Sequence, residues 1–213
     1  MKTKSNEWVS IADLMAGVVA VVMLLLVVSF LQRLSAEQLA REKDEMVEST
    51  RQQKVANLLI SMENEFKSNG LGALISVDSA ASELTLRDGV FSRGSACLTS
   101  NAEEAILALS VRLKSFLTDF PTGRVFVEGH TDNVPVSSPV TDFKKFCTVY
   151  DDNYTLSAAR ARETRKLFVT NLGSSLSKRI IVAGYGDSQP LKDIPPEDAS
   201  NRRVQVRLVV SEN

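Results

Sequence analysis

A carboxylate lies inside the one membrane-length apolar run in this chain. Asp13 comes five residues after Trp8, and the stretch from Leu14 to Val28 carries no charge. A carboxylate at the centre of a membrane helix costs roughly 2.5–3.5 kcal/mol on insertion scales, so such residues usually serve a function. Asp13 is therefore a candidate carrier of protons or other ions. Because it lies near one end of the run, it could instead snorkel toward the interface or pair with a partner residue.

The apolar run is long enough to cross a bilayer. A helix from Trp8 to Leu31 would span about 36 Å at 1.5 Å per residue. A cleaved signal peptide is the competing interpretation, but the run is long for one and shows no clean A-x-A site. Lys2 and Lys4 favour a cytoplasmic N-terminus, although Arg33 on the other side weakens that inference. We therefore expect a cytoplasmic tail in residues 1–7 and a transmembrane helix in residues 8–31.

A charged segment follows the apolar run. Residues 32–54 mix both signs and lack Gly and Pro, a composition that favours a solvated helix. An apolar stripe at helical spacing comes next, formed by Val55, Leu59, Met62 and Phe66. The stripe either packs on the following domain, or forms a dimer seam or a plug on the membrane. We treat residues 32–69 as a helical linker or plug, ended by glycines.

From residue 70 to residue 213 the pattern changes to that of an α/β domain. Apolar residues alternate with polar ones in the short segments expected to form strands, and the helical segments between them carry apolar stripes. Helices that alternate with strands predict a mixed sheet covered by helices on one side. The expected order is a hairpin at 75–86, a helix at 99–119, a strand at 124–128, a long loop at 131–154, a helix at 157–172, a strand at 179–183, a loop at 184–200 and a strand at 203–210.

Charge and cysteine content limit the class of protein. The net charge is −1, so composition gives no reason to expect a nucleic-acid partner. The two cysteines suit an oxidising compartment outside the cytoplasm. Cys97 and Cys147 would close a loop of about 50 residues if paired, worth roughly 4 kcal/mol in the chain-entropy model. The alternative is two buried free thiols.

Four sequence blocks in the second half occur in a distinctive order. They are Gly129-His-Thr-Asp132-Asn, Asn153-Tyr-Thr-Leu156-Ser-Ala-Ala-Arg160-Ala, Gly184-Tyr-Gly-Asp-Ser-Gln-Pro190 and Asn201-Arg-Arg-Val204. In this order they resemble the OmpA C-terminal family, which binds peptidoglycan. The resemblance covers roughly residues 74–210 and implies an OmpA-like α/β sandwich.

The resemblance also implies a binding site for the peptide stem. In the family, the residues that match Asp132 and Arg160 hold diaminopimelate, whose ammonium and carboxylate suit an acid and a guanidinium. The match at Asn153 and Leu156 suggests that they shape the site, and Asn201 is expected to close the pocket. An Asp–Arg pair that only braces the loop is the alternative. The loop from 133 to 152 is longer than in the family, so it could reshape the cleft or be tied back through Cys147.

Enzymatic and metal chemistry find little support in the sequence. His130 is the only histidine, and with two cysteines a zinc site is poorly supported. No nucleophile–base spacing or phosphate-binding loop is present. We read His130 as structural, and we expect no metal, no cofactor and no enzymatic activity.

Both ends of the chain together resemble flagellar stator B subunits of the MotB type. The stretch Trp8 to Met15 looks especially like the equivalent subunit of Zorya anti-phage defence systems. The resemblance implies a homodimer inside a ring of multi-spanning MotA-like subunits, in the bacterial inner membrane with the C-terminal domain in the periplasm. Asp13 would carry protons or sodium ions while the outer domain grips peptidoglycan. A flagellar stator, a passive envelope tether and a subunit of the ExbD or TolR kind are the alternatives.

Overall fold

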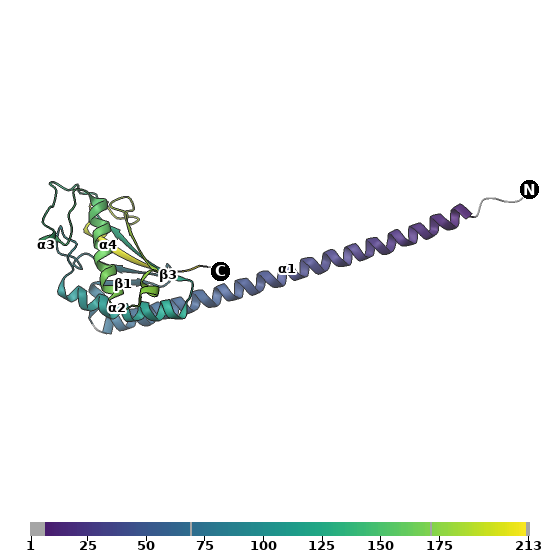
Figure 1. The fold of residues 1–213 in the computed structure, drawn as a ribbon, viewed down its shortest axis with the longest axis horizontal. Coiled ribbons are helices and arrows are strands. Elements are labelled where there is room, and N and C mark those ends of the chain that lie inside the picture. The colour runs from purple at the N-terminus through teal and green to yellow at the C-terminus, as the bar shows by residue number, and fades with distance from the viewer. Residues whose placement is uncertain (1–6, 69, 171, 212–213) are drawn as a thin grey trace, which may run out of the picture. The chain divides into compact units, whose positions relative to one another are not determined.

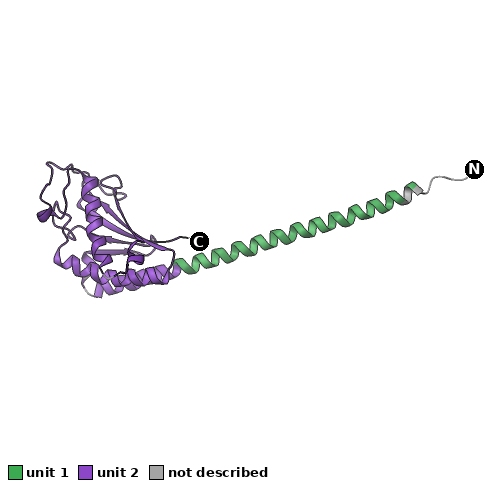
Figure 2. Ribbon diagram, viewed as in Figure 1, with its two compact units in different colours: residues 1–52 green, residues 53–213 purple. Residues whose placement is uncertain are grey.

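A computed structural model describes residues 7–68, 70–170 and 172–211 of the chain. The chain divides into two compact units, residues 1–52 and residues 53–213 (Figure 2). Nearly all of the predicted cytoplasmic tail, including Lys2 and Lys4, lies outside the described residues.

The described part of the first unit is helical throughout. It forms the beginning of α1 (Glu7–Ser68), the one helix of the described residues that is long and apolar enough to cross a membrane. The apolar side chains of this unit face outward: Leu24 is 65% exposed and Phe30 is 63% exposed. Such a surface is stable only when lipid or other apolar helices surround it. The helix therefore fits a single-pass membrane protein.

The last turns of α1 belong to the second unit. Val55, Leu59, Met62 and Phe66 are at most 4% exposed and form part of the core. This end of α1 runs beside α2 (Ser100–Asp119), as Figure 1 shows, and an ion pair joins Glu65 to Arg112 at 2.5 Å. Of the two interpretations of the apolar stripe, packing on the following domain is the one observed. The compact unit thus includes the last part of the segment predicted as a linker.

The sheet of the second unit has five strands in the order β1-β2-β5-β3-β4. The β3–β4 pair is parallel and the other pairs are antiparallel, so the predicted mixed α/β fold is confirmed. The predicted hairpin is β1 and β2, with Ile75 opposite Leu86. Strand bounds are β1 Ile75–Asp78, β2 Glu83–Leu86, β3 Gly123–His130, β4 Ile180–Gly184 and β5 Arg203–Val210.

Helices pack on one face of this sheet. The main ones are α2 and α4 (Asn153–Val169), which contact each other and β3. Their apolar stripes are buried, with Ile106, Phe116 and Phe168 fully so. Short helices complete the unit: η1 Leu71–Ala73, α3 Phe143–Phe146, α5 Ser174–Ser177 and η2 Ala199–Asn201.

The first turns of α4 lie against the backbone of two strands. A Cβ added at Gly129 of β3 would meet the Ser157 carbonyl oxygen at 2.0 Å, and one added at Gly184 of β4 would meet Ala158 at 2.6 Å. Only glycine allows a helix to approach a strand this closely. These two glycines therefore fix the start of α4 above the ends of β3 and β4.

The start of α4 differs from the prediction. The helix begins at Asn153, not near Ser157, because the Asp152 side chain caps it by accepting a hydrogen bond from the Thr155 backbone N–H at 2.6 Å. An N-cap aspartate satisfies an N–H that would otherwise lack a partner. The earlier start places Asn153 and Leu156 on the same helix as Arg160.

Candidate functional site

A cavity of about 780 Å³ opens where β3 ends and α4 begins. Asp132 follows β3, and Asn153, Leu156 and Arg160 come from the first turns of α4; all four line the cavity. They are four of the five residues that the sequence assigned to ligand binding. The structure brings these four together, and their role as ligand contacts stays a prediction.

Arg160 lies deep in the wall of the cavity. The residue is 4% exposed, its Nε donates to the Ser95 carbonyl at 3.0 Å, and its guanidinium carbon lies over the Phe91 ring, 5.4 Å from the ring centroid. Burial lowers the pKa of Arg160, and the charge of Asp88 opposes this effect most strongly. Within the described residues its two Nη groups have no hydrogen-bond partner. They are therefore free to donate to a carboxylate in the bidentate geometry that guanidinium favours.

Asp132 is held by an arginine that the sequence did not single out. Arg202 contacts the Asp132 carboxylate at 2.7 Å and also binds Asp88 through two hydrogen bonds, at 2.7 and 3.2 Å. Hydrogen bonding to Asp88 raises the pKa of Arg202, so this guanidinium stays charged. Among the described residues no ion pair joins Asp132 to Arg160. The Asp132 carboxylate and the Arg160 guanidinium thus line one cavity without forming an ion pair with each other.

The charges of the cavity are balanced. Three arginines and three acidic residues line it: Arg93, Arg160, Arg202, Asp88, Asp132 and Glu197. A cavity that presents both signs suits a ligand that carries both an ammonium and a carboxylate.

Asn153 and Asn201 hold the loops around the cavity. The Asn153 side-chain amide donates to the carbonyls of Asp132 and Val134, at 3.2 and 3.1 Å, and so fixes the start of the long loop. Asn201 is fully buried and does not line the cavity. Its amide bonds the backbone of the 191–196 segment, including the Leu191 N–H at 2.7 Å. The position of Asn201 suits a loop brace more than the closing of the pocket.

The long loop forms one wall of the cavity. It contributes Tyr150 and a run of mostly apolar or small residues: Val134, Pro135, Val136, Ser137, Ser138 and Val140. Cys147 in this loop forms a disulfide with Cys97, with Cα atoms 5.1 Å apart, so the predicted pairing is confirmed. The departure from the shorter family pattern therefore lies at the candidate site itself.

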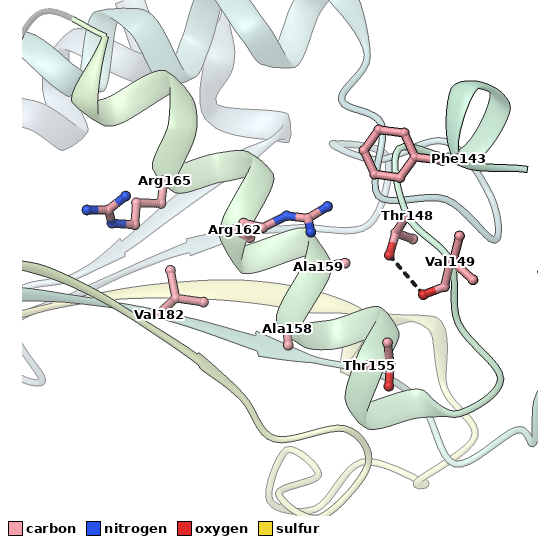
Figure 3. Close-up of a pocket in the computed structure, with 9 residues that line it drawn as sticks. All are labelled: Phe143, Thr148, Val149, Thr155, Ala158, Ala159, Arg162, Arg165 and Val182. Carbon is pink, nitrogen blue, oxygen red and sulfur yellow. Dashed lines mark hydrogen bonds between the residues drawn. The ribbon is translucent and has the colours of Figure 1, made fainter. Parts of the chain in front are cut away.

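A second cavity of about 760 Å³ lies on another face of α4. Figure 3 shows Phe143, Thr148 and Val149 of the long loop facing Arg162 and Ala159 of the helix. The Arg162 guanidinium donates to the Cys147 carbonyl at 2.9 Å, and no acidic residue is among the residues that line this cavity. It lacks the balanced charges of the first cavity, so we place the candidate site at the first.

His130 is buried at the end of β3. It is 1% exposed and its ring stacks on Tyr185 with centroids 5.3 Å apart. Within the described residues neither ring nitrogen has a hydrogen-bond partner. Burial, and then the charge of Arg203, lower the pKa of His130 from 6.5 to about 4, so the ring is neutral near pH 7. This placement suits the structural role inferred from the sequence.

Asp13 belongs to the first unit. Its side chain is exposed on α1 beside a hollow that Gly17, Val18 and Val21 also line. Gly17 leaves this side of the helix open, because nothing lies within 4 Å of a Cβ added there. The carboxylate is thus accessible to a helix packed against this face.

The fold and site define an α/β domain with a charge-balanced cavity at the junction of β3 and α4. A sequence model of the OmpA family matches residues 90–203, and the chain belongs to this family. It is 32% identical over 154 residues to the uncharacterized protein YtxE of Bacillus subtilis strain 168. That match covers 70% of this chain and 57% of YtxE, so the chain spans little more than half of this relative.

Two solved structures share the fold. The cell wall anchor of the T6SS from Pseudomonas aeruginosa is 24% identical, with a TM-score of 0.53, and the match covers 72% of this chain and 97% of that one. A putative MotB-like protein from Desulfovibrio vulgaris is 23% identical, with a TM-score of 0.54, and the match covers 75% and 99%. At these identities the likeness establishes the fold alone.

Proposed function

We propose that this chain is a membrane-anchored protein whose outer domain binds peptidoglycan. One observation carries the proposal: Asp132 lines the same cavity as Arg160, whose Nη groups have no hydrogen-bond partner among the described residues. Arg160 would bind the carboxylate of a diaminopimelate residue in the peptide stem, and Asp132 would bind its ammonium. Membership of the OmpA family supports this ligand class.

The ligand ammonium has a competitor in this arrangement. Arg202 already contacts one oxygen of the Asp132 carboxylate. A carboxylate has two oxygens and accepts several hydrogen bonds, so an ammonium can bind the other oxygen while Arg202 stays in place. Asp88 binds the same guanidinium through two hydrogen bonds, so Arg202 is held by both carboxylates.

Sedimentation with purified peptidoglycan tests wall binding. The full-length chain in detergent should sediment with peptidoglycan, and Arg160→Ala should abolish this while the near-ultraviolet circular dichroism spectrum stays that of a folded domain. Lys166→Ala is the matched control, because it removes a cation from an exposed position on the same helix. Sedimentation of Arg160→Ala equal to that of the wild type would sink the assignment.

We further propose that the anchored chain is the ion-carrying subunit of a membrane motor. Two copies would stand inside a ring of multi-spanning MotA-like subunits, with the N-terminus cytoplasmic and the second unit periplasmic. Asp13 would take up a proton from the outside and release it inside, and its change of charge would alter its contacts with the ring. The apolar surroundings of Asp13 and its open face at Gly17 support this role. The likeness of Trp8–Met15 to Zorya subunits favours anti-phage defence over motility.

Cytoplasmic acidification tests the motor. Cells would express the chain with a multi-spanning MotA-like subunit, and residues 32–50 would be deleted to remove the part of the linker that would act as a plug. We expect that the chain with Asp13 acidifies the cytoplasm and that the Asp13→Asn variant, at the same level in the membrane, does not. Equal pH traces for the two would contradict a proton path through Asp13 and leave a sodium path or a passive wall tether.

A further inference from the structure

The Cys97–Cys147 disulfide lies within a partly buried set of contacts that ends at the buried side chain of Arg160. The loop 92–98 and the loop 146–150 are joined by several hydrogen bonds beside the disulfide. The Ser95 hydroxyl and the Ala96 N–H both donate to the Phe146 carbonyl at 3.0 Å, and the Tyr150 hydroxyl donates to the Gly94 carbonyl at 2.6 Å. We call this group of contacts the loop clamp.

The loop clamp sets the position of one backbone oxygen. Ser95 is 2% exposed, its hydroxyl accepts from the Cys97 N–H at 2.9 Å, and its carbonyl accepts from Arg160 Nε at 3.0 Å. Cys97 is therefore two residues from the group that orients the guanidinium. On the other side of the disulfide, the Cys147 carbonyl accepts from Arg162, so α4 bonds both loops that the disulfide joins.

Arg160 depends on this carbonyl for its orientation. The Arg160 guanidinium also lies over the ring of Phe91, which belongs to the same short segment as Ser95. A buried guanidinium that lost its acceptor would turn toward Asp88 or Asp132, because these carboxylates line the same cavity and attract its charge. Its Nη groups would then no longer point at the ligand carboxylate.

We propose that the Cys97–Cys147 disulfide is a positioning element for Arg160, so that reduction of the disulfide weakens peptidoglycan binding. The inference rests on the proposed wall-binding function. A dithiol supplies the two electrons and two protons that convert the S–S bond into two thiols, and becomes a cyclic disulfide itself. Without the covalent link, the loop clamp holds the Ser95 carbonyl through hydrogen bonds alone, and the affinity falls roughly tenfold.

The first measurement reads the position of Arg160 without any ligand. Hydrogen exchange of arginine Nε–H groups is followed by NMR in the full-length chain, oxidised and reduced. The Arg160 Nε–H should be protected when oxidised and lose protection on reduction. The Nε–H of Arg179, which donates to the Gly123 carbonyl at 2.8 Å, is the internal control and should stay protected. Unchanged protection of Arg160, or loss of protection at both arginines, would overturn the inference.

The second measurement asks whether the effect on binding passes through Arg160. Reduction should lower sedimentation of the wild type with peptidoglycan and leave Cys97→Ser/Cys147→Ser unchanged. Arg160→Lys retains the charge but lacks the Nε–H that bonds the Ser95 carbonyl. In this variant reduction should change binding less than about twofold, because the side chain that the disulfide positions is absent. An equal loss in wild type and Arg160→Lys would refute positioning. Failure of the oxidised wild type to bind would count against the proposed function, while Arg160 protection would still decide the inference.

Discussion

Acid should destabilise the second unit through a single buried histidine. The ring of His130 is enclosed against Tyr185 and faces Arg203, and burial together with this charge lowers its pKa to about 4. In the unfolded chain the pKa returns to about 6.5. Between these two values the unfolded chain binds more protons than the folded one, so stability increases with pH in this window and is lost as pH falls.

The size of the effect follows from the two pKa values. The full difference corresponds to about 3 kcal/mol, and roughly 2 kcal/mol should be lost between pH 8 and pH 5. Urea unfolding of the full-length chain, followed by near-ultraviolet circular dichroism of the tyrosines, measures the free energy of unfolding at each pH. His130→Phe retains a ring against Tyr185 and cannot titrate, so it removes this contribution from the pH dependence.

Carboxylates also titrate in acid, so the difference between the two proteins is the quantity to follow. The stability of the wild type relative to His130→Phe should fall by roughly 2 kcal/mol from pH 8 to pH 5. A difference that stays constant across this range would contradict the prediction, because it would mean that His130 takes up its proton as readily in the folded domain as in the unfolded chain.

Two further predictions concern packing. Gly129→Ala should destabilise the second unit by more than about 3 kcal/mol in thermal unfolding, since its Cβ would meet a carbonyl of α4; Gly173→Ala, with open space around it, should change stability little. Leu59→Ala should cost roughly 2–5 kcal/mol in urea unfolding because Leu59 is fully buried. Ile60→Ala, which truncates the 44% exposed side chain next to Leu59, should cost less than about 1 kcal/mol. Equal losses of stability in Leu59→Ala and Ile60→Ala would place the end of α1 outside the core.

Periodicity accounted for most of the fold. The hairpin, the helix of residues 100–119 and the final strand were predictable because each buries one face and so shows its period in the sequence. The start of α4 was not predicted, because Asp152 gives no periodic signal and acts as a cap only once the loop before it has turned. The stripe at Val55–Phe66 had two possible partners, and only the folded domain distinguishes them.

The candidate site was predictable only where a motif marked it. Asp132 and Arg160 stand in recognisable sequence blocks. The ion partner of Asp132 is Arg202, which belongs to the last of these blocks but was assigned no role from the sequence. Asp88 lies well before these blocks in the sequence, and its approach to Arg202 follows from the pairing of β2 with β5. Asn201 is the converse case. Its place in a sequence block suggested that it closes the pocket, whereas in the structure its side chain forms hydrogen bonds with the backbone of the 191–196 segment.

Binding of a soluble stem peptide tests whether Arg160 and Asp132 hold a zwitterionic ligand. The full-length chain would be titrated calorimetrically with a diaminopimelate-containing stem peptide, and with the same peptide amidated at the free diaminopimelate carboxylate. We expect that the first peptide binds to the wild type and that amidation weakens binding at least tenfold, because Arg160 loses its anionic partner. Arg160→Lys should show a smaller difference between the two peptides. Equal affinity of the wild type for both peptides would contradict the assignment of Arg160 and Asp132 to a zwitterionic ligand.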